Sequence, residues 1–186
     1  MIPTIRTQSK APLLLGLLVF VFAGCAYYKD SITDKSTWLK QSAGVLRSAI
    51  DTNQIELACT KLMNQPEIVI AIRTYSQQAI ADLDEAASLL TNPKLKSYGT
   101  EYGEGAEIVD PKNPEEIYCF NFQSNGQIWG FTKRVAAYNN GRQRVLKRMA
   151  FYSNGRLAAD NGGHLTFKED GELDHCFING KYMTIK

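Results

Sequence analysis

Between residues 36 and 92, apolar side chains recur at helical spacing. The clearest stripe follows Pro66 at intervals of three, four and seven residues, and its members are Ile68, Ile72, Tyr75, Ala79, Leu83 and Leu90. An amphipathic helix buries side chains at these intervals, and proline is favoured in a first helical turn. We therefore predict a helix from Pro66 to Asn92. The β-branched residues at 68–72 would also allow a strand, but the stripe continues well beyond them.

Two shorter helices are predicted before this one. A first apolar stripe comprises Trp38, Leu39, Val45, Leu46 and Ile50. Further on, Asn53 and Glu56 have the spacing of a capping box. The helix that this box predicts would bury Ile55, Cys59 and Leu62. The region therefore holds about three helices, and the acidic cluster of Asp82, Asp84 and Glu85 is interpreted as a solvated helix face.

Residues 93–116 follow neither a helical nor a strand pattern. They contain three prolines and three glycines and little apolar periodicity. Loops of this length are uncommon inside compact domains. We interpret the segment as a linker between two parts of the chain or as a long functional loop.

Residues 117–186 have the pattern of an antiparallel β-meander. Six turn dipeptides divide this part: Asn125-Gly126, Asn140-Gly141, Asn154-Gly155, Asn161-Gly162, Asp170-Gly171 and Asn179-Gly180. Such pairs accept positive φ at both central positions, as a two-residue type I′ hairpin requires. The intervening segments alternate, and their predicted buried residues are Tyr118, Phe120, Phe122, Trp129, Phe131, Val135, Val145, Met149, Phe151, Leu165 and Phe167. The sequence thus predicts an α+β fold with up to seven short strands.

The first 24 residues have the layout of a signal peptide. Arg6 and Lys10 precede an apolar run from Leu13 to Ala23, and no acidic residue occurs before Asp30. The run is about half of the roughly 20 apolar residues that a membrane-spanning helix needs. We therefore interpret residues 1–24 as a targeting segment.

The stretch VFAGC at the end of this run resembles the lipobox of bacterial lipoproteins. In that family the cysteine sulfur is diacylated, as with palmitate, and the chain is cut before the cysteine. The resemblance implies a lipid anchor on Cys25, a tether over residues 25–35 and a membrane partner. Ala26 follows the cysteine, which in the best-known members goes with the outer membrane, facing the periplasm. The alternative is an ordinary secretory peptide cut near Ala23.

Three units of the C-terminal part, FQSNGQIWG, FYSNGRLAA and FKEDGELDH, share one pattern. Each has an aromatic residue three positions before the Asn or Asp and an apolar residue two positions after the Gly. The units resemble MORN-type repeats, including the antitoxin-repeat variety, in which each hairpin adds a rung to an extended sheet. In that family the repeats support protein or membrane contacts, so the resemblance implies a binding module.

Charge and cysteine content narrow the interpretation. The net charge of +2 lacks the strongly basic character that nucleic-acid binding requires, and without residues 1–24 the chain is formally neutral. Cys59, Cys119 and Cys176 would remain in an oxidising compartment. Either one disulfide forms, with Cys119 to Cys176 favoured because both lie on predicted strands, or all three thiols are buried in the core.

Candidate catalytic groups are few. His175 cannot activate Cys176, because adjacent strand residues point to opposite faces. His164 acting on Cys176 with Asp160 as orienting group is the one remaining catalytic arrangement. No CxxC, HxH or HExxH motif occurs, so neither a metal nor another cofactor is predicted. We therefore expect a protein that is not an enzyme.

Arginines gather in one predicted strand region. Arg142, Arg144 and Arg148 would share a face opposite Lys147 and Met149. Such a row either protects a sheet surface with charge or contacts an acidic partner: anionic lipid headgroups, peptidoglycan or an acidic protein. The predicted function is a non-catalytic binding or assembly component of the cell envelope. The alternative is a periplasmic immunity or inhibitor protein that neutralises a toxin or hydrolase.

Overall fold

The computed structural model describes residues 37–100, 103–135 and 144–186. The predicted signal peptide, the tether, Cys25 and Arg142 lie outside the described residues. Trp38–Lys186 form one compact unit. All further statements concern this unit.

Nine antiparallel strands form a single sheet in which each strand pairs with its neighbours in sequence. They are β1 (Lys96–Thr100), β2 (Gly103–Asp110), β3 (Asn113–Phe122), β4 (Ile128–Val135), β5 (Val145–Phe151), β6 (Leu157–Ala159), β7 (Leu165–Phe167), β8 (Leu173–Ile178) and β9 (Lys181–Thr184). The helices α2 (Thr52–Lys61) and α3 (Pro66–Leu90) precede the sheet, and residues 37–47 are also helical. The predicted α+β class is confirmed.

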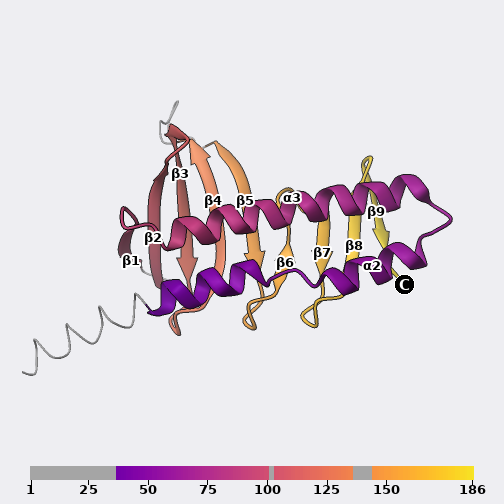
Figure 1. The fold of residues 1–186 in the computed structure, drawn as a ribbon, viewed down its shortest axis with the longest axis horizontal. Coiled ribbons are helices and arrows are strands. Elements are labelled where there is room, and N and C mark those ends of the chain that lie inside the picture. Colours follow the sequence, from indigo (N-terminus) through magenta and orange to yellow (C-terminus); the bar gives the residue numbers. More distant parts are fainter. Residues whose placement is uncertain (1–36, 101–102, 136–143) are drawn as a thin grey trace, which may run out of the picture. The chain divides into compact units, whose positions relative to one another are not determined.

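The helices lie on one face of the sheet, and α3 runs across the strands (Figure 1). Two contacts fix this crossing. The ring of Tyr75 stacks on His164, beside β7, with the ring centroids 4.1 Å apart. Further along α3, the hydroxyl of Tyr118 on β3 donates a 2.6 Å hydrogen bond to Glu85. One face of the sheet is therefore covered and the other is not covered by any described helix.

The helix boundaries follow local capping. α3 begins at Pro66 as predicted, and residues 68–72 are helical rather than extended. The predicted capping box at Asn53 is wrong, because Asp51 is the N-cap of α2 and accepts hydrogen bonds from the backbone of Asn53 and Gln54. The Asp51 carboxylate thus caps the first turn of α2, and Asn53 lies inside the helix.

Large apolar side chains fill the space between the helices and the covered face. The buried residues there include Tyr118, Phe120, Phe122, Phe131, Met149, Phe151, Leu165 and Phe167, as the alternating pattern predicted. Trp38 stacks on Phe122, with centroids 5.2 Å apart, and thereby joins the first helical residues to the sheet.

The predicted numbers of elements are wrong in detail. Residues 93–116 are not a linker, because they contain β1, β2 and the beginning of β3, and the sheet has nine strands rather than seven. The described residues contain two complete helices, α2 and α3, and not the three that were predicted. Gly105 on β2 shows why the strands escaped detection: a Cβ there would lie 2.5 Å from the ring of Tyr98. This glycine permits close packing within the sheet and does not mark a linker.

Three hairpin turns share a geometry that differs from the predicted type I′. In the β3–β4 turn, the amide of Gly126 donates to Gln123 and the amide of Gln123 donates to Gln127. The same two bonds occur around Gly155 and Gly171, and each glycine has a φ between +82° and +91°. This is a three-residue loop with glycine in the left-handed conformation. Among the described turns, Asn179-Gly180 has positive φ at both central positions.

Each of these three hairpins also has a register shift just after its turn. In the first, Phe122 faces Ile128 but Asn121 faces Gly130, so Trp129 is an extra residue. Equivalent shifts follow the pairs Phe151–Leu157 and Phe167–Leu173. A further shift places Val145 outside regular alternation. Trp129 and Val145 were predicted to be buried, but the shifts leave them 44% and 52% exposed.

Candidate functional site

The side chains of adjacent β5 residues lie on opposite faces of the sheet. Lys147 points to the covered face, where its ammonium contacts Asp82 of α3. Met149 is buried on the same face. Arg148 therefore points to the uncovered face, as the predicted alternation required.

The inward lysine belongs to a network of charged groups beneath α3. Asp82, predicted to be solvated, is 2% exposed. Glu85 contacts Lys147 at 3.5 Å and Lys112 at 2.8 Å. Burial alone would raise the pKa of Glu85, but hydrogen bonds from Lys112 and Tyr118 and the charge of Lys147 lower that pKa to about 2.

A second group of ion pairs lies beside the first. The Lys133 ammonium is 2.5 Å from Asp110, 2.7 Å from Glu116 and 5.1 Å from the centre of the Tyr118 ring. Burial opposes the charge of Lys133, yet its acidic partners raise its pKa above the ordinary value. The pKa shifts of Glu85 and Lys133 favour the charged forms of these two side chains, which suits their place in ion pairs.

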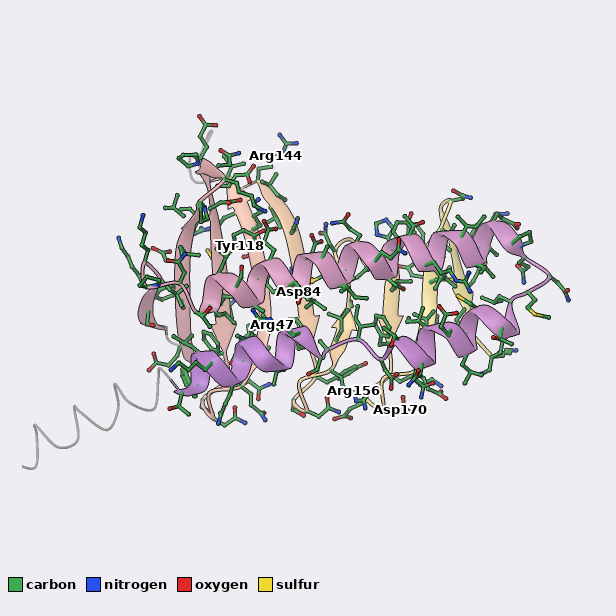
Figure 2. The ribbon with its side chains drawn as sticks, viewed as in Figure 1. Arg47, Asp84, Tyr118, Arg144, Arg156 and Asp170 are labelled. Carbon is green, nitrogen blue, oxygen red and sulfur yellow. The ribbon has the colours of Figure 1, made fainter. Side chains whose placement is uncertain are left out.

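Arg144 and Arg148, here called the β5 arginine pair, differ from these lysines. Both side chains are exposed, and neither forms an ion pair with another described residue. Figure 2 shows Arg144 at one end of β5, away from the helices. The predicted third member, Arg142, lies outside the described residues. Arg148 presents uncompensated positive charge on the uncovered face, and Arg144 presents it at the end of β5. The register shift between Lys133 and Arg134 lies between the two arginines, so the prediction that they share a face by simple alternation is wrong.

One row across the centre of the uncovered face consists of small or uncharged residues. A row of facing residues crosses it through cross-strand pairs and consists of Gly105, Asn121, Gly130, Ala150, Ala159 and Thr166. Nearby, Arg134 Nε donates to the sulfur of Cys119 at 3.1 Å, and Arg134 Nη2 lies 4.0 Å from Glu107 Oε2. The Tyr98 ring lies against Gly105, but small residues from Gly130 to Ala159 leave room for another surface to approach closely.

The predicted disulfide does not form. Cys59, Cys119 and Cys176 are free and buried. Cys119 is on β3 and Cys176 is on β8, five strands away in the same sheet. Strands lie about 4.8 Å apart, so about 24 Å separates the two, whereas bridged cysteines need Cα atoms within about 7 Å.

The three residues of the possible catalytic arrangement come together only in part. His164 Nδ1 lies 3.9 Å from Asp160 and 3.0 Å from the carbonyl oxygen of Asn161. The Cys176 thiol is 1% exposed, and burial raises its pKa. A thiol without a base or positive charge that lowers its pKa is a poor nucleophile. Asp160 instead supports the β6–β7 turn by accepting the amide of Leu165 at 2.9 Å.

Within the described part of the chain, no group of three or more His, Cys, Asp or Glu side chains is placed to hold a metal ion. None of the helices within the same ranges combines the length and apolar character needed to cross a bilayer.

Comparisons with known proteins add no functional assignment. No protein-family model matches the chain, and neither curated proteins nor solved structures give a significant match. The functional inference therefore depends on the chain's own residues.

Proposed function

We propose that this protein is a lipid-anchored, non-catalytic binding component of the bacterial cell envelope. The single observation that carries the binding role is the β5 arginine pair, which is exposed and has no ion-pair partner among the described residues. Lys133 and Lys147, on the covered face, both have acidic partners. The β5 arginine pair is therefore available to an acidic group on a partner.

The partner that fits this surface is the acidic surface of another envelope protein. A sheet face with small central residues suits an extended protein contact, and complementary charge at its border would guide association. The lipobox at VFAGC supports a location where such a partner is held at the same membrane. Lipid attachment at Cys25 would anchor the chain stably, because two or more acyl chains bind a membrane far better than one.

Site-specific cross-linking in cells tests the binding role. A photoreactive residue at position 150, on the uncovered face, should capture one partner. The charge reversal Arg144→Glu with Arg148→Glu should reduce that capture at least tenfold. Lys181→Glu is the matched control, because Lys181 is also exposed and has no ion pair among the described residues. Equal capture by all three proteins would refute the proposal.

The identity of the captured partner separates the envelope role from the alternative. An envelope assembly protein supports the proposal, whereas a toxin or hydrolase inhibited on binding would replace it with an immunity function. Anchoring is tested separately with Cys25→Ala. This variant should leave the membrane fraction and lose incorporation of labelled palmitate, and membrane retention without any labelling of the wild type would refute the anchor.

A further inference from the structure

A pocket lies where β2 extends beyond β1. The two strands pair from Lys96 opposite Glu107 to Thr100 opposite Gly103. β2 continues to Asp110, so three of its residues have no β1 neighbour. The segment that leads from α3 into β1 forms the other wall. The pocket has a volume of about 520 Å³.

The inside of this pocket is aliphatic. Its apolar lining comprises Pro93, Leu95, Ile108, Val109 and Ile117. Val109, one of these lining residues, is 52% exposed. Small-molecule pockets typically enclose about 300–1,000 Å³ and are lined mainly by apolar side chains. The pocket therefore has the size and lining of a site for a small apolar ligand.

The rim of the pocket is basic. Lys94 and Lys96 are exposed and form no ion pair with any described residue. The acidic member of the lining, Glu107, lies 4.0 Å from Arg134, which offsets its charge. Two uncompensated ammonium groups thus border an aliphatic cavity, and this combination favours a ligand that is anionic at one end and apolar along the rest.

We propose that this pocket binds a single-chain anionic amphiphile of the fatty-acid class. The acyl chain lies against Leu95, Val109 and Ile117, and its headgroup contacts Lys94 and Lys96. The inference does not depend on the proposed partner or on the anchor at Cys25, since it uses neither the β5 arginine pair nor the leader.

An added β-strand is a poorer occupant of the same place. Three residues of β2 extend over about 10 Å, at about 3.3 Å per residue. Strands in proteins usually have about five or six residues, so this edge is too short to hold one. The shortness of the uncovered edge therefore favours a chain that binds by apolar contact and charge rather than by backbone hydrogen bonds.

Photo-labelling of the full chain in membranes tests the proposal. The probe is a dodecanoic acid that carries a diazirine, and attachment is mapped by mass spectrometry. Labelling should concentrate on peptides that contain residues 93–96 and 107–109, and unlabelled dodecanoate should compete at least fivefold better than dodecyltrimethylammonium. Labelling spread evenly over exposed apolar residues, or equal competition by both amphiphiles, would overturn the proposal.

Two matched substitutions localise the effect. Val109→Gln should reduce labelling at least fivefold, whereas Val145→Gln should not, although both valines are 52% exposed. Both side chains are at the surface, so folding should persist, as circular dichroism would verify. Lys94→Gln with Lys96→Gln should remove the preference for dodecanoate, with Lys181→Gln as control. Equal effects of the two valine variants, or an unchanged preference in the lysine variant, would count against the site.

Discussion

The covered and uncovered faces of the sheet are built from alternate residues of the same strands, but they handle size and charge differently. On β4, Phe131 is buried beneath the helices while Thr132 faces the other way and is half-buried. On β5, Lys147 is paired with an aspartate while Arg148 has no acidic partner among the described residues. The covered face therefore buries the large apolar side chains that stabilise the fold, whereas packing constrains the uncovered face less.

The largest effect is expected from removing an aromatic ring on the covered face. Phe120→Ala should lower the free energy of unfolding by about 4 kcal/mol, because Phe120 is fully buried and its loss leaves a cavity. Asn121→Ala, the next residue on the uncovered face, should change it by less than about 0.5 kcal/mol. Urea unfolding measures both. Similar losses in the two variants would mean that the faces do not differ in their contribution to stability.

Breaking the inward ion pair should have the next largest effect. Lys147→Met leaves the buried Asp82 carboxylate with the 3.0 Å hydrogen bond from Gln78, and the substitution should cost about 3 kcal/mol. Arg148→Met should be nearly neutral in the same urea experiment. The double variant Asp82→Asn with Lys147→Met should recover at least half of the loss. A lysine variant as stable as the arginine variant would contradict the assigned pairing.

Turns in contact with the helices should tolerate change less than turns that are not. Gly126→Ala should cost about 2 kcal/mol, because φ is +82° and the added Cβ would lie 1.8 Å from the Trp38 side chain. Gly180 has a similar φ of +77° but nothing within 4 Å, so Gly180→Ala should cost only about 1 kcal/mol. Thermal unfolding of the two variants measures the difference. Equal shifts would show that the Trp38 contact contributes nothing.

The smallest expected effect depends on pH. Burial raises the pKa of Asp160 from 3.8 to about 6. Between these values the folded chain keeps a proton on Asp160 that the unfolded chain has released, so the contribution of this group to stability is greatest below about pH 4 and falls as the pH rises through 6. In this range the slope should approach about 1.4 kcal/mol per pH unit. Asp160→Asn should remove this slope, and Asp170→Asn, in an exposed turn, should keep it. A slope that persists in Asp160→Asn would assign it to another group.

Local patterns predicted the parts of the fold that local forces determine. The stripe from Ile68 to Leu90 gave α3, and alternation gave the buried face from Tyr118 to Phe122. Trp129 and Val145 were misplaced because register shifts reset the alternation, and a shift depends on the partner strand. The first two strands were missed because the strand pattern there is masked by glycine.

The candidate site was likewise predicted only where local alternation determines it. The exposure of Arg148 opposite Lys147 follows from alternation alone and was predicted. The pairing of Lys147 with Asp82 joins residues 65 positions apart and requires the rotation of α3 over β5, which no local pattern encodes. The pocket beside Val109 depends on β1 being shorter than β2, so its only sequence signal is the pair of lysines before β1.

Because α3 runs across the strands, its length is related to the number of strands in the sheet. A helix of 25 residues is about 37 Å long, and the eight spacings between nine strands total about 38 Å. The length of α3 therefore matches the width of the sheet. Insertion of one more hairpin would widen the sheet by about 10 Å and call for about six or seven additional helical residues. Relatives with different hairpin numbers should differ in helix length by matching amounts.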